Sequence, residues 1–176
     1  YDHQPMDLNN QIALVTGAAR GIGKASAKIL GEHGAHVVIA DLNEALAQEA
    51  AREFEQAGIS AEGLLLDVAD PSSISGVIAD VVARHGQIDI LVNNAGIVNF
   101  NSVGETTLEE WDRVIDINLR GVHLCSQTVI KHMISRRRGK IVNLASMGGQ
   151  VGGLMVGPDY VSSKAGVVGL AKSYAR

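Results

Sequence analysis

The segment that decides the fold is Thr16-Gly17-Ala18-Ala19-Arg20-Gly21-Ile22-Gly23, which follows the apolar run 12–15 and leads directly into a helical pattern. Glycines allow a tight turn between a strand and a helix, and they let a phosphate approach the positive N-terminus of that helix. The phosphate loop of nucleoside triphosphatases does not fit, because it would require Gly at Ala18 and Ser or Thr at Ala25. The segment therefore predicts a nucleotide-binding turn and disfavours a triphosphatase.

Short apolar runs alternate with helical patterns along the chain. The first four runs start about every 25 residues, and Gly34, Gly58 and Gly86 stand just past the intervening helices, as helix C-caps do. The expected strands are 12–15, 36–40, 62–66, 88–92 and 140–144. Strands that alternate with helices form a parallel sheet covered on both faces. We therefore predict a doubly wound α/β fold of the Rossmann type, as a single domain over residues 1–176 with a flexible leader at 1–7.

Composition and charge exclude several classes of protein. The chain has 176 residues, of which 46% are hydrophobic, enough for one domain with a core. Its net charge of −4 gives no general attraction to nucleic acid, and no apolar run is long enough to span a bilayer. Cys125 cannot form an internal disulfide, and the six His residues follow no metal-ligand spacing. We expect a cytoplasmic protein that binds no nucleic acid, membrane or metal.

Polar residues at the ends of the predicted strands are candidates for ligand binding, because open parallel sheets bind ligands at the carboxyl ends of their strands. Asp41 ends the second strand, where a carboxylate can bind both hydroxyls of an adenosine ribose and repel a 2′-phosphate. Its alternative role is to cap the next helix. Arg20 is an opposing indication, since it could reach such a phosphate, but we expect Asp41 to prevail and NAD to be preferred. Asp67 and Asn94 follow the next two strands, and either could instead belong to an ordinary turn.

Tyr160 and Lys164 lie four residues apart at the start of a predicted helix, so their side chains point the same way. The ammonium group would favour the ionised phenol, because a nearby cation typically lowers the pKa of an acid by roughly 1 to 3 units. Such a phenol can act as a general acid and base. The spacing alone also fits an ordinary surface pair of Tyr and Lys. Other motifs of the chain are needed to distinguish an acid–base pair from a surface pair.

Two further polar residues are candidates for the same site. Asn118 falls inside the buried stripe of one long helix, about 28 residues, that is expected to start near Thr107. A buried amide needs hydrogen-bond partners, so Asn118 belongs either to a structural network or to the site. Ser146 ends the fifth predicted strand and opens a glycine-rich stretch, 148–157, where a simple turn is the alternative.

In order along the chain, the motifs Thr-Gly-x-x-x-Gly-Ile-Gly, Asn-Asn-Ala-Gly, Asn, Ser and Tyr-x-x-x-Lys resemble those of the classical short-chain dehydrogenase/reductase family, from about residue 8 to residue 176. The resemblance implies that Tyr160 is the acid or base at the substrate oxygen and that Ser146 holds that oxygen. It implies that Lys164 lowers the pKa of Tyr160 and binds the nicotinamide ribose, while Asn118 holds a water that relays protons. The implied cofactor contacts are Gly17, Arg20, Gly21, Ile22, Gly23, Asp41, Leu42, Asp67, Val68, Asn94, Ala95, Gly96, Tyr160 and Lys164.

The resemblance also implies hydride transfer between a nicotinamide ring and a secondary alcohol carbon. Since Asp41 favours NAD over NADP, we expect an NAD-dependent alcohol or polyol dehydrogenase. A 3-oxoacyl-thioester (acyl-carrier-protein) reductase also fits, although that role usually goes with NADPH. A non-catalytic nucleotide-binding scaffold would be expected to lack Tyr160 or Lys164. Residues 152–156 are expected to line part of the substrate pocket.

Members of the family usually continue through further strands and a helical lid, whereas this sequence stops within the helix that carries Lys164. We therefore expect a truncated chain that is poorly soluble and inactive as residues 1–176. The helix near 107–135 is apolar on more than one stripe, and the helix near 160–176 is rich in small residues that permit close packing. Both features indicate a homo-oligomer, a dimer or tetramer, formed through these helices.

Overall fold

The computed structural model describes residues 7–153 and 155–176, so the predicted leader, apart from Asp7, lies outside the described residues. The strands are β1 (Ile12–Thr16), β2 (His36–Asp41), β3 (Ala61–Leu65), β4 (Ile90–Asn93) and β5 (Lys140–Asn143). The helices are α1 (Gly21–Glu32), α2 (Glu44–Gln56), α3 (Pro71–His85), α4 (Leu108–Ile115), α5 (Gly121–Arg136), α6 (Gly148–Val151) and α7 (Pro158–Tyr174), with a π-helix η1 (Asp116–Arg120). All predicted strands are confirmed with small shifts at their ends, whereas the short α6 was not predicted.

The strands form one parallel sheet in the order β3-β2-β1-β4-β5. The strand order reverses between β1 and β4, because the chain first builds outward through β2 and β3 and then returns to the other side of β1. The crevice outside the carboxyl ends of strands at such a reversal is the usual ligand site of open α/β sheets. The predicted doubly wound fold is therefore confirmed, and it locates the site to examine.

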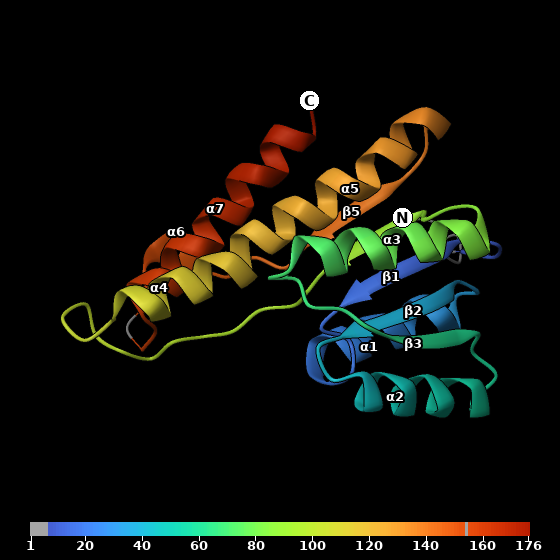
Figure 1. Cartoon of the computed structure of the whole chain (residues 1–176), viewed down its shortest axis with the longest axis horizontal. Coiled ribbons are helices and arrows are strands. Elements are labelled where there is room, and N and C mark those ends of the chain that lie inside the picture. Colours follow the sequence, from blue (N-terminus) through green and yellow to red (C-terminus); the bar gives the residue numbers. More distant parts are fainter. Residues whose placement is uncertain (1–6, 154) are drawn as a thin grey trace, which may run out of the picture.

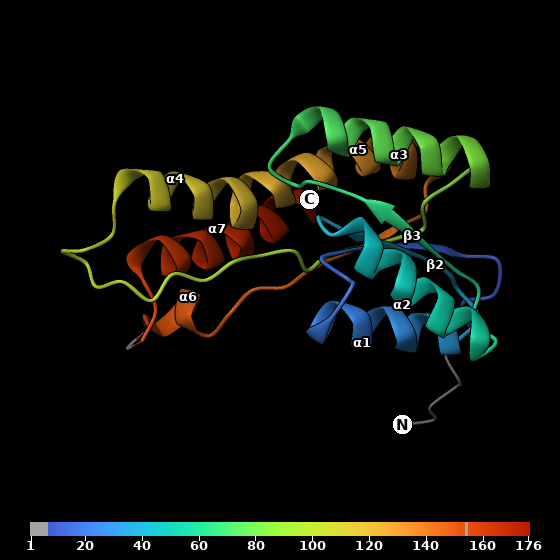
Figure 2. The ribbon, with the colours of Figure 1, turned by 60° about the horizontal axis from the view of Figure 1, so that its bottom comes forward.

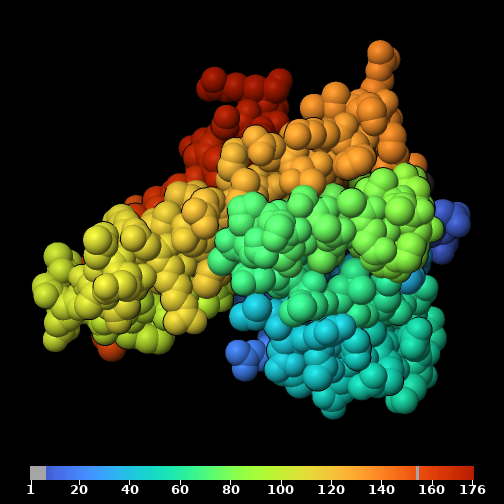
Figure 3. All heavy atoms as spheres, in the orientation of Figure 1, coloured from blue at the N-terminus to red at the C-terminus, as the bar shows by residue number. Residues whose placement is uncertain are grey.

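Helices cover both faces of the sheet (Figures 1 and 2). Side chains alternate along each strand, so Val15 packs with α1 and α2 on one face while Leu14 and Val38 pack with α3 and α5 on the other. In the space-filling view, the green atoms of α3 lie between the orange atoms of α5 and the blue-green segment around α2 (Figure 3). Burial on both faces explains why these strands are continuous apolar runs in the sequence.

The long helix predicted from Thr107 is confirmed, although it is not uniformly α-helical. Its start is a capping box, in which the side chains of Thr107 and Glu110 each accept a hydrogen bond from the backbone N–H of the other. The π-helix η1 interrupts it between α4 and α5, and Asn118, which is fully buried, lies within that interruption. Single π-turns inside α-helices are frequent at functional sites.

Within 7–153 and 155–176, none of the helices combines the length and apolar character that crossing a membrane requires.

The single cysteine, Cys125, is buried in the core, and burial raises the pKa of its thiol to about 12. At neutral pH this thiol is protonated, so Cys125 acts as a small core residue.

A buried carboxylate links β1, β4 and α5 at the amino end of the sheet. Asp89 is 1% exposed, and its carboxylate accepts hydrogen bonds from Ile12 N (2.9 Å) and Arg136 Nη2 (2.6 Å). Replacing Asp89 with Ala is expected to lower the free energy of unfolding by about 3 kcal/mol, because the Ile12 N–H loses its acceptor and the Arg136 guanidinium loses its carboxylate partner. Urea denaturation measures the loss. In the control, Glu32→Ala, only an exposed pair with Lys28 is removed, and a loss as large as that of Asp89→Ala would contradict the assignment.

Candidate active site

The glycine-rich turn after β1 is fixed to the loop after β4 by side-chain hydrogen bonds. Thr16 Oγ1 accepts from the backbone N–H groups of Asn94 (3.1 Å) and Ala95 (3.0 Å). Asn94 Nδ2 donates to the carbonyl oxygens of Thr16 (2.9 Å) and Gly17 (2.8 Å). A Cβ at Gly17, whose φ is +62°, would lie 2.8 Å from Ala95 Cα, and one at Gly23 would collide with Asn94 Nδ2. Close packing of the two loops therefore requires glycine at both positions.

The N-terminus of α1, which follows this turn, is suited to an anion. The side chains of Asn43, Asp70 and Thr107 cap α2, α3 and α4. In contrast, no side chain among the described residues caps α1, and its first turn carries no acidic residue. The free N–H groups and the helix dipole at such an end favour a bound phosphate.

A cavity of about 370 Å³ opens beside the turn, at the carboxyl ends of the strands. Ten predicted cofactor residues line it: Gly17, Arg20, Ile22, Asp41, Leu42, Asp67, Val68, Asn94, Ala95 and Gly96. Two others have different positions. Gly21 faces a separate surface depression together with Lys24 and Phe54, and Gly23 is buried beneath the turn. The glycines at 21 and 23 therefore shape the turn, and the ten residues named first form the cavity wall.

The carboxylate of Asp41 is held at the edge of this cavity by backbone N–H groups. Oδ2 accepts from Ala19 N (3.1 Å) and Oδ1 accepts from Asn43 N (3.0 Å). The alternative role of Asp41 as a helix cap belongs instead to Asn43, whose side chain accepts from Leu46 N. Arg20 lines the same cavity. The residue that would repel a 2′-phosphate and the residue that could bind one therefore lie in the same cavity.

A second cavity, of about 230 Å³, adjoins the first and leads toward α7. The two cavities share four lining residues, which are Ile22, Asn94, Gly96 and Ile97. Tyr160 and Lys164 line the second cavity. The predicted cofactor residues and the predicted acid–base pair therefore lie along one continuous cleft, which runs from Asp41 to Tyr160.

Lys164 is buried, and its ammonium group is fixed. Nζ donates a hydrogen bond to the carbonyl oxygen of Leu144 (2.8 Å) and lies 5.8 Å from the centroid of the Tyr160 ring. Burial lowers the pKa of Lys164 below its ordinary value. In the described part of the chain no carboxylate pairs with this ammonium. A desolvated positive charge beside a phenol can stabilise the phenolate.

Asn118 joins the loop after β4 to α7. Its Oδ1 accepts from Ile97 N (2.8 Å), and its Nδ2 donates to Ile97 O (2.8 Å) and to Ser163 Oγ (3.2 Å). A Cβ built at Gly96 would lie 3.2 Å from Asn118 Oδ1 and 3.6 Å from Lys164 Nζ. Asn118 therefore belongs to a structural network and also lies close to the ammonium group. Ser163, which donates to Tyr160 O (2.7 Å), was not predicted.

Ser146 follows β5 and faces the same space as Tyr160. Its Oγ accepts a hydrogen bond from Gly148 N (3.1 Å). A Cβ built at Gly148 would lie 3.5 Å from Ser146 Oγ and 4.0 Å from Tyr160 Cε1. Across the described residues, no hydrogen bond joins the Tyr160 hydroxyl to Ser146 or Lys164, and catalytic hydrogen bonds often close only with substrate bound. The structure therefore brings the three predicted side chains together without linking them directly.

The residues just before Tyr160 include a buried carboxylate and part of the expected substrate pocket. Asp159, which was not predicted, is fully buried and accepts from Asn99 Nδ2 (3.0 Å) and Tyr160 N (2.7 Å), so it anchors the start of α7. Of the residues expected to line the substrate pocket, Leu154 lies outside the described residues and Met155 is exposed.

Comparisons with known proteins agree with this geometry. A family model described as "short chain dehydrogenase" matches residues 11–176. The chain is 39% identical over 171 residues to 3-oxoacyl-[acyl-carrier-protein] reductase FabG of Vibrio cholerae, a match that covers 97% of this chain and 68% of that protein. It is 38% identical over 170 residues to the (2S)-[(R)-hydroxy(phenyl)methyl]succinyl-CoA dehydrogenase subunit BbsD of Thauera aromatica. That match covers 97% of this chain and 68% of that protein. A solved structure described as "Crystal structure of gox2181" is similar with a TM-score of 0.94 at 34% identity, covering 97% of this chain and 67% of that one.

Proposed function

Because the chain belongs to the short-chain dehydrogenase/reductase family, a family of oxidoreductases, we propose that it interconverts a 3-oxoacyl thioester and the corresponding 3-hydroxyacyl thioester. The observation that carries this proposal is a pair of relatives at 39% and 38% identity, one named for an acyl-carrier-protein substrate and the other for a CoA substrate. Both names describe acyl thioesters. This reaction, which the sequence suggested only as an alternative, now ranks above the oxidation of an alcohol or polyol.

The residues of the cleft fit a nicotinamide dinucleotide. The turn at Gly17 and the uncapped start of α1 would take its phosphates, Asp41 its adenosine ribose, and Asp67 its adenine. Tyr160 and Lys164 stand at the other end of the same cleft. When bound, such a cofactor supplies the hydride that is exchanged with the substrate carbon.

Side chains of the protein, and not the cofactor, exchange the proton with the substrate oxygen. We assign Tyr160 as the general acid in reduction and the general base in oxidation, with Ser146 donating a hydrogen bond to the same oxygen. The buried ammonium of Lys164 stabilises the phenolate that remains after Tyr160 gives up its proton. Asn118, beside Lys164, would hold the water through which that proton is replaced.

We further propose that NAD is preferred over NADP. The support is the carboxylate of Asp41, which lies at the cavity edge and would repel a 2′-phosphate. This preference favours a second candidate function, an NAD-dependent alcohol or polyol dehydrogenase, because 3-oxoacyl-thioester reduction usually goes with NADPH.

A substrate comparison separates the two candidates. With the complete chain in purified form and either cofactor, we expect kcat/KM for a 3-oxoacyl thioester to exceed that for simple ketones by at least about tenfold, because the acyl chain and thioester add binding contacts. Absorbance of the reduced nicotinamide reports each rate. Turnover of polyols without turnover of the thioester would overturn the substrate assignment and leave the acid–base assignment in place.

A homo-oligomer formed through the helices near 107–135 and 160–176 is also proposed. Leu108 and Ile134 are large apolar residues exposed on the first of these segments, and a Cβ at Gly169 on the second would meet open space. Gly166, by contrast, packs against Leu119 within the chain. The cytoplasmic location stays a prediction.

A further inference from the structure

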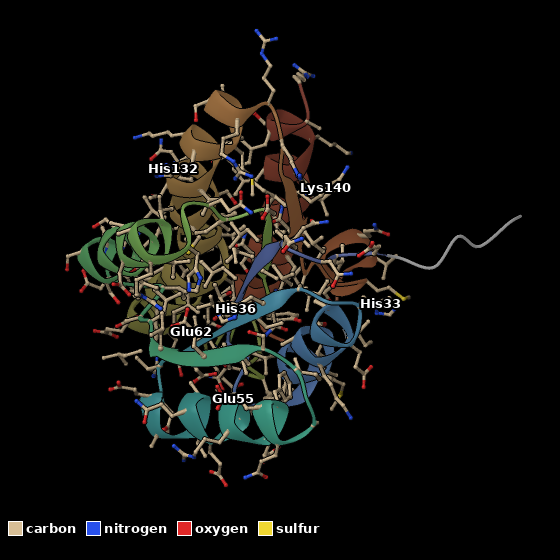
Figure 4. All side chains as sticks on the ribbon, turned by 90° about the vertical axis from the view of Figure 1, so that its right-hand side faces the viewer. His33, His36, Glu55, Glu62, His132 and Lys140 are labelled. Carbon is tan, nitrogen blue, oxygen red and sulfur yellow. The ribbon has the colours of Figure 1, made fainter. Side chains whose placement is uncertain are left out.

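A cluster of two histidines and a glutamate lies at the amino end of the sheet. His36 begins β2, Glu62 lies on β3 and His85 ends α3. Figure 4 labels His36 and Glu62, which lie near each other on these neighbouring strands. Asp41 of the cleft ends the same strand five residues beyond His36, which is roughly 16 Å away at the usual rise of a strand. The cluster is therefore separate from the proposed active site.

The ligand atoms of the cluster converge on one point. His36 Nε2 and His85 Nε2 lie 3.4 Å and 2.8 Å from the same oxygen, Glu62 Oε1. One ligand atom from each of the three residues lies within 4.8 Å of the other two. Bonds of about 2.0–2.2 Å from Zn²⁺ to nitrogen and oxygen place two ligands of a tetrahedral site roughly 3.3 Å apart. Small side-chain movements would therefore allow all three to bind one ion.

The surroundings of His36 match those of a metal-binding histidine. Its Nδ1 lies 2.7 Å from Ser60 Oγ, while its Nε2 faces Glu62. Metal-binding histidines almost always donate the second ring N–H to an oxygen, which fixes the tautomer and the ring orientation. In the tautomer that donates Nδ1–H to Ser60 Oγ, Nε2 directs a lone pair at the Glu62 carboxylate. That contact is favourable only when a proton or a cation lies between the two atoms.

The charged groups in and around the cluster favour a cation. Arg84 pairs with Glu62 Oε2 and with Asp80 Oδ2, the latter at 2.7 Å. Two carboxylates and one guanidinium leave one net negative charge when the histidines are neutral. Arg84 Nη1 also lies 3.4 Å from His85 Nε2, so a cation bound to His85 has to displace the guanidinium from that contact. The displaced guanidinium can stay paired with Asp80. The three ligand residues are partly exposed, so solvent ions can reach them.

We propose that His36, Glu62 and His85 form a binding site for a divalent transition-metal ion of the Zn²⁺ class, through Nε2 of each histidine and Oε1 of the glutamate. Two imidazoles and a carboxylate suit Zn²⁺, whereas Mg²⁺ and Ca²⁺ prefer oxygen ligands alone. The fourth position is left to water. The ion joins β2, β3 and α3, so it stabilises the fold at the end of the sheet opposite the cleft. The sequence predicted no metal because the three ligands come from separate elements and follow no local motif.

Thermal unfolding and calorimetric titration with Zn²⁺ test the site in the otherwise unmodified protein. Zn²⁺ at ten times its Kd should raise Tm by about 3–6 °C, and Mg²⁺ at the same concentration should have no comparable effect. His36→Ala and His85→Ala should each weaken Zn²⁺ binding by more than about 100-fold, and Ser60→Ala by about 10–100-fold. His33→Ala and His132→Ala are matched controls, because these residues lie outside the cluster (Figure 4), and they should retain the affinity.

The alternative is a cluster held together only by protons and ion pairs. In that case Zn²⁺ does not raise Tm, or His85→Ala binds Zn²⁺ as tightly as His33→Ala, and either result overturns the proposal. The visible spectrum of added Co²⁺ needs no variant: the bands of a low-coordinate nitrogen and oxygen site support the proposal, and a spectrum of hydrated Co²⁺ alone refutes it. None of these measurements depends on catalytic activity.

Discussion

Replacing Tyr160 with Phe is expected to lower kcat by about 10²–10⁴-fold, the range typical of general acid–base catalysis. Phe has nearly the same shape but no hydroxyl with which to exchange a proton at the substrate oxygen. Binding of the dinucleotide should change little, because the larger cavity between the turn and Asp41 does not include Tyr160. Steady-state kinetics give kcat, and a fluorescence titration with the reduced cofactor gives its Kd.

Tyr174 offers a matched control on the same helix. Its hydroxyl contacts His123 on α5 and lies outside the residues that line the cleft. The change Tyr174→Phe should therefore leave kcat close to that of the unmodified protein. Retention of more than a tenth of the normal kcat in Tyr160→Phe, with normal kcat in Tyr174→Phe, would remove Tyr160 from the proposed role.

The second large effect is expected at Asp41. At ~4 Å and an effective dielectric constant of about 20, each unit of like charge costs roughly 4 kcal/mol. Asp41 is partly exposed, and solvent reduces that repulsion, so we expect Asp41→Asn to shift the kcat/KM ratio toward NADP by about 10- to 100-fold. Arg20, which lines the same cavity, then faces the 2′-phosphate without a competing carboxylate.

Asp67→Asn is the control for this prediction, because it makes the same chemical change in the same cavity. Asp67 is assigned to the adenine, which NAD and NADP have in common, so the ratio of the two cofactors should not change. An unmodified protein that already prefers NADP, or an Asp41→Asn variant with an unchanged ratio, would show that Asp41 does not set the preference.

The parts of the fold that sequence predicts are those encoded by neighbouring residues. Strands buried on both faces are continuous apolar runs, and Thr107 with Glu110 gives a capping box within one helical turn. Tyr160 and Lys164 are likewise four residues apart on one helix, so their proximity follows from helix geometry alone. These predictions depend on local periodicity, and the structure confirms the elements.

The features that the sequence does not reveal are contacts between distant segments. Thr16 Oγ1 accepts hydrogen bonds from residues 78 and 79 positions away, and Asn93 Nδ2 donates to Asn143 at a separation of 50. The π-turn around Asn118 has no local signal either, because packing against Ile97 and Ser163 positions that amide. The cluster of His36, Glu62 and His85 exists only once the sheet has formed.

One cleft should hold a nicotinamide dinucleotide that extends from Asp41 to Tyr160. A crystal structure of the protein with bound NAD tests it most directly. We expect the adenosine ribose hydroxyls within hydrogen-bond distance of the Asp41 carboxylate, and the nicotinamide ring beside the hydroxyl of Tyr160 and the ammonium of Lys164. A dinucleotide bound in the larger hollow between α5, β5 and α7, or a nicotinamide ring turned away from Tyr160, would contradict it.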